Sequence, residues 1–311
     1  MRPGVIKVVI VTYNSAAEIR GCIEALPGSS DKYALEITVV DNGSQDGTLR
    51  EVARLDHPVH VIPSTNMGYA HGCNLAIREA LQGGKEYGAI LILNPDLVLP
   101  VGAVDRLAEA LFSAPDIGGV SPHAMEETGN ENHRHKTLFG APMNEECMDG
   151  RGVVVSDRLH GCCMLLRPEV FRKTGLFDEQ YFLYWEELDF GGRAIADGFK
   201  LLLCYDILVY HRCDTEERTH RIFYMWRNQF LFARKRYPAF VRLMFLLRRA
   251  LSSLRELLGF MKIKRFDLVR AAMAGLSAGL RGETGKSSNP YASPVSLAVS
   301  GLHRSGNAPA D

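Results

Sequence analysis

Three carboxylates stand close together after an aromatic run, and they are the side chains best suited to acid–base chemistry. Glu186, Glu187 and Asp189 follow the run FLYW (182–185) at the start of a predicted helix over 186–197. A carboxylate whose pKa is tuned by partial burial and by its neighbours can act as a general base. The alternative is structural, because acids are favoured at the positive N-terminal end of a helix. The aromatic run favours the wall of a site, since a solvated acidic face would not need it.

Polar clusters follow the first three predicted strands. They comprise Thr12, Tyr13 and Asn14, then Asp41 and Asn42, then Asn66, Gly68 and Asn74. Open α/β sheets bind ligands at the carboxyl ends of their strands. A carboxylate there can accept hydrogen bonds from a base or ribose hydroxyl, and helix-opening amides can meet phosphate. Taken alone, the cluster at 41–44 is equally typical of a plain turn followed by a helix cap.

A metal site is the third candidate. The apolar run 91–93 ends abruptly at Asn94, Pro95 and Asp96. A carboxylate there can hold Mg²⁺ or Mn²⁺ against a diphosphate, because these ions prefer oxygen ligands and keep several waters. A strand followed by an Asx-Pro turn is the structural alternative. His211 ends a later predicted strand, where a lone histidine is more often structural than a ligand.

The hydrophobic pattern predicts a scaffold that gathers these strand ends. Apolar, β-branched runs at 5–11, 37–40, 59–62 and 89–93 alternate with helical patterns at 16–26, 47–55 and 72–81. This alternation indicates a mostly parallel central sheet with helices on both faces. Later elements are predicted as a helix over 101–113 and strands over 160–166 and 200–209. Residues 118–158 show only a weak pattern, which predicts loops or a flexible insertion.

Several classes of protein are excluded by composition and motifs. A chain of 311 residues with 46% hydrophobic residues can bury a large core, so general disorder is excluded. We expect neither a spanning helix nor a signal peptide from the apolar runs. Seven cysteines, an odd number without a CxxC pair, indicate a reducing cytoplasm. Neither GxGxxG nor GxxxxGK[ST] occurs, which disfavours Rossmann-type dinucleotide binding and P-loop NTPases.

The net charge of zero hides an uneven distribution. Between Arg218 and Arg265 lie thirteen Lys and Arg and one acid, Glu256, so this window carries +12. Basic amphipathic helices are predicted over 212–282, and a flexible tail over 283–311. Such helices indicate peripheral binding to an anionic membrane surface, although their apolar face could instead pack on the domain formed by residues 1–211. No recognised nucleic-acid module accompanies the basic residues, so we expect no nucleic-acid partner.

The order of the motifs also carries a family resemblance. Across residues 5–235, about three quarters of the chain, the sequence resembles family 2 glycosyltransferases of the GT-A fold, especially the bacterial rhamnosyltransferase-like branch. The resemblance rests on VVIVTYNS, TVVDNGSQDGT, NMGYAHGCN, LILNPDLVL, HGCCMLLRPEVFRKTGLFDEQYFLYWEELDFGGRAIADGFK, VYH and FYMWRNQFLF. It implies an inverting enzyme with a nucleotide-diphosphate sugar as donor, dTDP-rhamnose first and UDP-sugars next. The implied acceptor is a hydroxyl of a cell-envelope glycan or a polyprenyl-linked molecule, reached from the cytoplasmic face of the plasma membrane.

The resemblance also implies site residues. The donor nucleotide would be held by the strand-end set of Thr12, Tyr13, Asn14, Asp41, Asn42, Asn66, Gly68, Asn74 and Asn94. Asn94 replaces the first acid of the DxD-type motif, so Asp96 would be the main ligand of Mg²⁺ or Mn²⁺, and His211 would complete the metal site. The family's base lies in a pair that commonly reads Glu-Asp. Here Glu187 takes the place of Asp and is expected to be the base, Glu186 remains the other candidate, and Asp189 would orient the acceptor or cap the helix.

Two other functions remain compatible with these residues. A sugar nucleotidyltransferase also combines an α/β nucleotide fold with metal carboxylates, but it would be expected to carry a Gly-rich basic loop where this chain has TYNSAAEIRG. A nucleotide-sugar-binding protein without catalysis is suggested only by the unusual Glu186-Glu187 pair.

Overall fold

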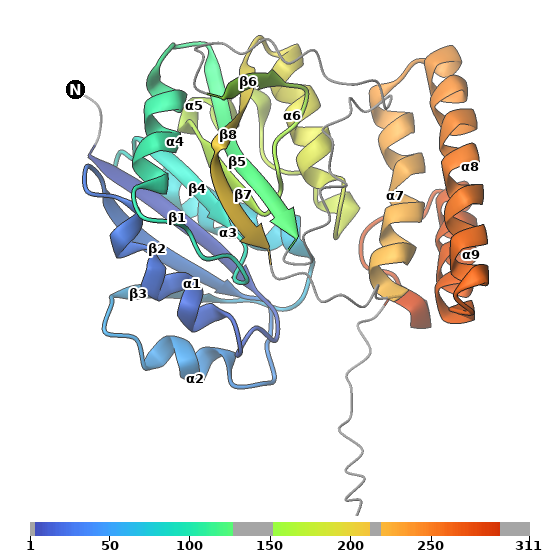
Figure 1. Ribbon diagram of the computed structural model, residues 1–311, viewed down its shortest axis with the longest axis horizontal. Coiled ribbons are helices and arrows are strands. Elements are labelled where there is room, and N and C mark those ends of the chain that lie inside the picture. Colours follow the sequence, from blue (N-terminus) through green and yellow to red (C-terminus); the bar gives the residue numbers. More distant parts are fainter. Residues whose placement is uncertain (1–3, 127–151, 212–218, 293–311) are drawn as a thin grey trace, which may run out of the picture.

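One sheet organises the chain. The computed structural model describes residues 4–126, 152–211 and 219–292 (Figure 1). Within these ranges eight strands lie side by side in the order β3-β2-β1-β4-β7-β5-β8-β6. They are β1 (Val5–Thr12), β2 (Ala34–Asp41), β3 (Val59–Pro63), β4 (Ala89–Leu93), β5 (Ile117–Glu126), β6 (Val153–Ser156), β7 (Cys163–Leu166) and β8 (Lys200–His211).

Parallel pairing dominates the sheet. Strands β3, β2, β1 and β4 are all parallel, and β5 is parallel to β8. Strand β7 runs antiparallel between β4 and β5, and β6 is antiparallel to β8 at the edge. In the parallel part Thr12 lies opposite Asp41, and Asp41 lies opposite Pro63. The first two predicted polar clusters therefore start at the same edge of the sheet.

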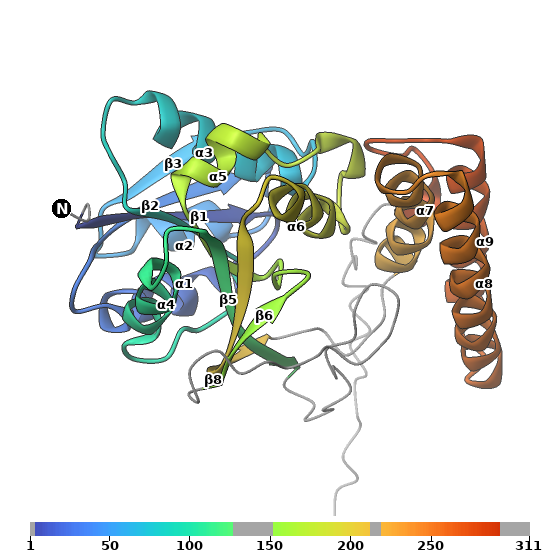
Figure 2. The ribbon, with the colours of Figure 1, turned by 90° about the horizontal axis from the view of Figure 1, so that it is seen from above.

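Helices cover both faces of the sheet, as predicted. One face carries α1 (Ile19–Ala25), α2 (Thr48–Ala53) and α4 (Ala103–Phe112), and the other carries α3 (Tyr69–Gln82), α5 (Pro168–Thr174) and α6 (Glu186–Ala196) (Figure 2). Successive residues of a strand point to opposite faces. Accordingly, Val8 and Ile10 pack in the first core, whereas Val9 and Val11 pack in the second.

The prediction of loops over 118–158 is wrong at both ends of that range. Strand β5 covers residues 117–126 and β6 covers 153–156, while residues 127–151, with most of the predicted insertion, lie outside the described residues. Gly118, Gly119 and Pro122 interrupt the apolar pattern of β5, so the sequence does not indicate a strand there. A Cβ on Gly119 would lie 2.6 Å from Leu166, so the glycine permits close packing, and the register shifts between Pro122 and His123.

Three helices follow the sheet domain and stand beside it (Figures 1 and 2). They are α7 (Thr219–Arg236), α8 (Ala239–Lys262) and α9 (Phe266–Arg281). An aromatic cluster joins them to the sheet domain, with the Trp185 ring 5.1 Å from Phe232 of α7 and 6.3 Å from Phe245 of α8 between centroids. In the part of the chain that the structure describes, none of the helices is both long and apolar enough to cross a membrane.

The chain beyond α9 differs from the predicted flexible tail. Residues 283–292 pack against the rest of the molecule and end in a short 3₁₀ turn, Pro290–Ala292. The buried Arg227 donates a hydrogen bond of 2.6 Å to the carbonyl of Gly285, and Lys286 donates one of 3.0 Å to the carbonyl of Asn66. These partners lie more than fifty residues away along the chain, so local sequence could not reveal them. The remainder of the predicted tail, 293–311, lies outside the described residues.

Candidate active site

The ends of β1 and β2 form a buried polar floor. Thr12 Oγ1 donates a hydrogen bond of 3.1 Å to Asp41 Oδ1, and both residues are buried. Asp41 Oδ2 accepts hydrogen bonds from the backbone N–H groups of Gly43 and Ser44, at 3.2 and 3.1 Å. Residues 41–44 therefore form the turn that was the structural alternative for this cluster. Thr12 and Asp41 hold the loop in shape beneath the surface.

The exposed part of this edge is formed by the next two residues. The Tyr13 side chain is 40% exposed, and Asn14 is also exposed. Asn14 has a φ of 55°, donates its backbone N–H to Ser44 Oγ at 2.9 Å and accepts from the backbone N–H of Gln45 at 2.8 Å. Its side chain thus pins the loop after β1 to the loop after β2. Tyr13 and Asn14 are positioned to meet a ligand from solvent.

The third polar cluster brings another loop into direct backbone contact. Asn42 Nδ2 donates to the carbonyl of Gly68 at 3.2 Å, and Asn66 Oδ1 accepts from the N–H of Gly68 at 3.3 Å. The N–H of Tyr69 donates to the carbonyl of Phe182 at 2.8 Å. A Cβ on Gly68, whose φ is 105°, would lie 2.3 Å from that carbonyl oxygen. Only glycine allows this approach, and the approach carries the loop before α6 to the strand ends.

We expect Gly68→Ala to separate the two loops. The added Cβ would overlap backbone that cannot move aside as a flexible side chain can. The catalytic activity of the site should fall about tenfold or more and the melting temperature should drop, measured by steady-state kinetics and by circular dichroism. Gly84→Ala is the matched control, because Gly84 also has a positive φ, 72°, but its Cβ would meet open space. Equal losses in both variants would show that backbone strain, and not the loop contact, matters at Gly68.

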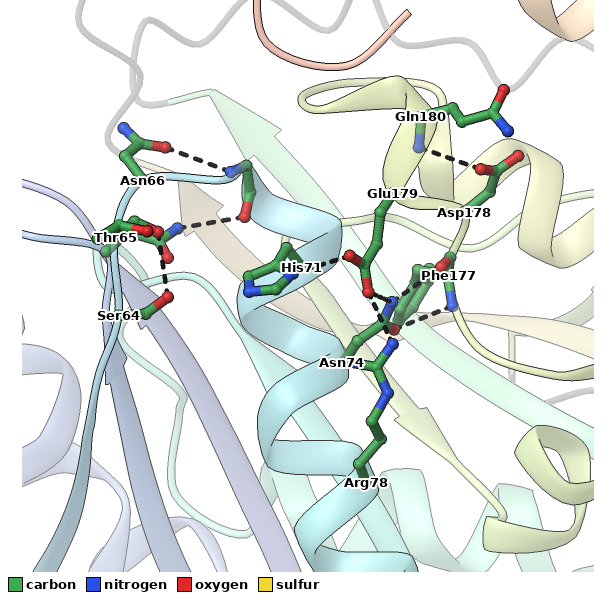
Figure 3. Close-up of polar contacts among 12 residues, drawn as sticks. Ser64, Thr65, Asn66, His71, Asn74, Arg78, Phe177, Asp178, Glu179 and Gln180 are labelled. Carbon is green, nitrogen blue, oxygen red and sulfur yellow. Dashed lines mark hydrogen bonds and ion pairs between the residues drawn. The ribbon is translucent and has the colours of Figure 1, made fainter.

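The side chain of Asn74 is bound by the protein itself. Its Nδ2 donates to the carbonyl of Phe177 at 2.9 Å and to Glu179 Oε1 at 2.8 Å, and its Oδ1 accepts from the N–H of Phe177 at 3.1 Å (Figure 3). His71 and Arg78 bind the same carboxylate, each at 2.8 Å. The buried amide is therefore occupied by the segment that leads to α6. Asn74 holds this segment on α3 and is not available to a nucleotide.

Glu179 makes this connection dependent on pH. Burial alone would raise its pKa, but the hydrogen bonds from Asn74, His71 and Arg78 lower it to about 2. The unfolded chain has a pKa of about 4.3 at such a residue, so the ionised Glu179 stabilises the fold above that pH, and the contribution is lost as the pH falls toward 2. Glu179→Gln should therefore lower the melting temperature at neutral pH. The difference from wild type should shrink in acid, whereas Glu169→Gln, at an exposed position, should change little throughout.

The acid pair lies at the start of α6. Glu186 is buried, and its Oε2 has no hydrogen-bond partner among the described residues. Burial, followed by the charge of Glu187, raises the pKa of Glu186 well above its usual range. Glu187 is half-buried against Gly161, where an added Cβ would lie 3.2 Å from Glu187 Cγ, and burial raises its pKa as well. The pair thus offers one buried and one more accessible carboxyl group of raised proton affinity.

Tyr69, which follows Gly68, lies near the acid pair and was not among the residues predicted from the sequence. Its hydroxyl donates to the carbonyl of Gly161 at 3.2 Å. Burial raises the pKa of Tyr69, and the nearby carboxyl group of Glu186 acts in the same direction, so the phenol and the carboxyl group are neighbours. In the sequence, the one feature that could have indicated Tyr69 is its position between Gly68 and a predicted helix.

The side chain of Asp189 is bound within α6. Its buried carboxylate accepts a hydrogen bond of 2.8 Å from Arg193 Nε, one turn along α6. Arg193 also donates to the carbonyls of Thr174 and Leu176, both at 2.8 Å. Asp189 therefore ties α6 to the segment after α5. This arrangement does not support the expectation that Asp189 orients an acceptor. Its carboxylate, in the first turn of α6, still interacts favourably with the positive N-terminal end of the helix.

The loop before the acid pair has a strained backbone. Phe182, Tyr184 and Trp185 have φ angles of 65°, 64° and 78°. Bulky residues rarely adopt this left-handed conformation, which costs of order 1–3 kcal/mol each and persists only where surrounding contacts impose it. Trp185 is the residue immediately before α6. The strain is therefore located where it sets the direction of Glu186 and Glu187.

The residues that the resemblance implies as metal ligands form no complete coordination site among the described residues. The backbone N–H of Asn94 donates to the carbonyl of Cys162 at 2.8 Å, which fixes the turn after β4. Burial and then the nearby charge of Asp96 raise the pKa of Cys22 to about 12. Within 4–126, 152–211 and 219–292, no three His, Cys, Asp or Glu side chains are grouped to hold an ion. His211 is the last residue of β8, opposite Glu126, and its side chain lies outside what the structure describes.

One carboxylate is nevertheless compatible with the implied ion. Mg²⁺ is commonly bound by one or two carboxylates together with substrate phosphates and waters. Asp96 follows a strand whose neighbour is β1, beside the floor formed by Thr12 and Asp41. The oxygen chemistry of this residue therefore fits Mg²⁺ or Mn²⁺.

The sequence is similar to those of known glycosyltransferases. The family profile described as glycosyl transferase family 2 matches residues 7–175, more than half of the chain. The low-salt glycan biosynthesis hexosyltransferase Agl10 of Haloferax volcanii is 25% identical over 292 residues, covering 90% of this chain and 92% of the relative. The N-acetylglucosaminyl-diphospho-decaprenol L-rhamnosyltransferase of Mycobacterium tuberculosis is 26% identical over 221 residues, or 63% and 72% of the two chains.

Solved structures share the fold. The mannosyltransferase PcManGT from Pyrobaculum calidifontis, in complex with GDP-Man and Mn²⁺, superposes with a TM-score of 0.58 at 19% identity, over 94% of this chain and 78% of its own. GalNAc-T7 with UDP, GalNAc and Mn²⁺ has a TM-score of 0.57 at 17% identity, over 67% of this chain and 44% of its own. At these identities the likeness concerns the GT-A fold alone.

Proposed function

The chain belongs to glycosyl transferase family 2, and from that premise we propose that it transfers a sugar from a nucleotide diphosphate to an acceptor hydroxyl with inversion. The observation that carries the proposal is the acid pair. Glu187 lies half-buried at the start of α6, with a pKa raised by burial, and the loop before it packs on the glycine loop after β3. This arrangement supports Glu187 as a base that acts beside strand ends suited to a nucleotide.

The proposed reaction is a single displacement. Glu187 removes the proton of the acceptor hydroxyl, whose oxygen forms a bond to the anomeric carbon. The bond between that carbon and the diphosphate oxygen breaks, and its electron pair leaves with the nucleoside diphosphate. Glu187 is preferred to Glu186 because Glu186 is only 5% exposed, so an acceptor would reach Glu187 more easily.

The residues of the proposed donor site form two groups, those that would contact the nucleotide and those that would hold the loops in place. Four of the predicted residues have surface that a nucleotide can reach, namely Tyr13, Asn14, Asn66 and Asn94. The buried members hydrogen-bond to protein and would support the site from below, namely Thr12, Asp41, Asn42, Gly68 and Asn74. We propose dTDP-rhamnose as the first donor to examine and UDP-sugars as the next. The name of the mycobacterial relative, an L-rhamnosyltransferase, supports this order.

A divalent ion is part of the proposal. Asp96, with His211 as a second candidate, would hold Mg²⁺ or Mn²⁺. When bound, such an ion neutralises negative charge that develops on the leaving diphosphate. The presence of Mn²⁺ in two solved structures of the same fold supports this choice.

We propose a cell-envelope glycan or a polyprenyl-linked molecule as the acceptor. The mycobacterial relative is named for a decaprenol-linked acceptor, and the archaeal relative for glycan biosynthesis. An enzyme with such an acceptor would act from the cytoplasm as a peripheral protein at the inner face of the plasma membrane.

A panel of nucleotide sugars tests the proposal. Each labelled donor is incubated with the protein and Mg²⁺ or Mn²⁺, and metal-dependent donor hydrolysis and thermal shift are measured. Release of nucleoside diphosphate from one donor, abolished by a chelator, is the expected result. Pyrophosphate-dependent exchange would instead identify a nucleotidyltransferase. Thermal stabilisation without any turnover, even with acceptor lipids, would indicate a binding protein and contradict the proposal.

A further inference from the structure

Helix α8 carries an apolar row that no part of the described chain covers. Seven large side chains recur along it at alternating steps of four and three residues, and each is at least 51% exposed. They are Phe240, Met244, Leu247, Leu251, Leu254, Leu258 and Met261, here called the α8 row. At 1.5 Å per residue the row is about 32 Å long. Exposed apolar surface of this extent marks a binding surface.

The opposite side of α8 accounts for its packing on the protein. Phe245 and Phe260 are buried in the aromatic and aliphatic clusters beneath the helix. Arg249 donates to Gln229 Oε1 at 3.0 Å, and Glu256 accepts from Trp226 Nε1 at 3.1 Å. The only acid of α8 is thus turned toward α7. The α8 row is therefore not needed for packing within the described chain.

A line of cations accompanies the α8 row. Arg248, Arg255 and Lys262 are exposed, lie seven residues apart, and each directly follows a member of the row. An apolar stripe with cations at its border is suited to a bilayer surface, where the stripe enters the acyl boundary and the cations meet anionic headgroups. A second copy of α8 is a poorer occupant, because no acid on its outer side could pair with these cations in either orientation.

We propose that the α8 row and its cation line are a docking surface for an anionic lipid bilayer. Figures 1 and 2 show α8 on the outer side of the helical region, away from the sheet. Its other side touches Trp185, which lies 6.3 Å from Phe245 between ring centroids and 5.9 Å from the Arg249 guanidinium. Docking would hold the start of α6, with Glu187, near the membrane. The purpose of this surface rests on the proposed lipid-linked acceptor, but the binding itself does not.

Flotation of the full-length protein with vesicles tests the surface. Vesicles of phosphatidylcholine alone are compared with vesicles that also contain phosphatidylglycerol. We expect wild type to float only with the anionic vesicles and to be released by salt. Replacing the cations, in Arg248→Gln/Arg255→Gln/Lys262→Gln, should weaken binding roughly a hundredfold, since each cation contributes about fivefold. The control Arg50→Gln/Arg172→Gln/Lys200→Gln removes three exposed cations from the sheet domain and should bind as wild type does.

The row is tested separately from the cations. Leu247→Ser/Leu251→Ser/Leu254→Ser should abolish flotation, whereas the same three residues changed to Met should retain it. Failure of wild type to float, or equal losses in the cation variant and its control, would overturn the proposal. A dimer mass in solution that the Ser variant converts to a monomer would assign the row to a second copy instead. Because flotation uses neither donor nor acceptor, its outcome is independent of whether the chain transfers a sugar.

Discussion

Replacement of Glu187 by Gln is expected to abolish nearly all sugar transfer while donor binding stays measurable. Gln keeps the size of the side chain but cannot accept the acceptor proton, and general-base catalysis contributes about 10²–10⁴-fold in rate. Glu187 is half-buried against Gly161, so an amide of equal volume should fit without moving α6. Steady-state kinetics should show a lower kcat, and titration of the nucleotide sugar should show a Kd near that of wild type.

Two variants of the pair distinguish the base from its neighbour. Glu187→Asp recreates the Glu-Asp pair common in the family and should retain much of the activity. Glu186→Gln should lower transfer less than Glu187→Gln, because the Glu186 side chain is almost fully buried. Full activity in Glu187→Gln, or a greater loss in Glu186→Gln, would contradict the assignment of the base.

The same assignment determines the direction of the pH dependence. Burial raises the pKa of Glu187, and only its ionised form accepts a proton. Activity should therefore increase with pH through a pKa above the usual value of about 4.3. A profile of kcat/KM from acid to neutral pH in the presence of the metal checks this. In Glu187→Gln the residual rate should lose this acidic limb, and its persistence would point to another base.

Replacement of Asn228 by Asp is expected to cost the enzyme roughly a hundredfold in kcat, the scale of a small misplacement of catalytic groups. Asn228 Nδ2 donates to the carbonyls of Tyr181, Leu183 and Tyr184, at 3.0, 2.8 and 2.9 Å. These contacts hold the strained loop that directs the acid pair. Asp has the same shape but no N–H groups, so its carboxylate would face carbonyl oxygens and the loop would relax.

A control separates this effect from the change of residue type. Asn289→Asp makes the same substitution where the side-chain oxygen accepts from the N–H of Tyr291 at 3.0 Å, a bond that a carboxylate retains. We expect it to leave both kcat and melting temperature close to wild type. Circular dichroism of Asn228→Asp should show a folded protein of lower melting temperature. A folded Asn228→Asp variant with wild-type kcat would show that the loop does not position the acids.

Local sequence accounts well for the parallel half of the sheet. The runs at 5–11, 37–40, 59–62 and 89–93 lie within β1, β2, β3 and β4, because a buried parallel strand leaves a continuous apolar run. Strand β5 escaped prediction because Gly118, Gly119 and Pro122 interrupt its apolar pattern. Strand β6 escaped prediction because it has only four residues, too few for a clear periodicity.

Polar and charged residues show most clearly what the linear sequence predicts and what only the folded structure reveals. The linear sequence was enough to predict the family, the GT-A fold, the acid pair after the aromatic run and a basic C-terminal region. These features depend on residue types and spacing, which a linear pattern preserves. Only the folded chain shows that Asn74 and Asp189 are bound by protein groups, that Asn228 holds the strained loop, and that the apolar side of α8 lies outward. The physical reason is that an amide, a carboxylate or a leucine acquires its role from the partner it meets, and in a folded chain that partner comes from far along the sequence.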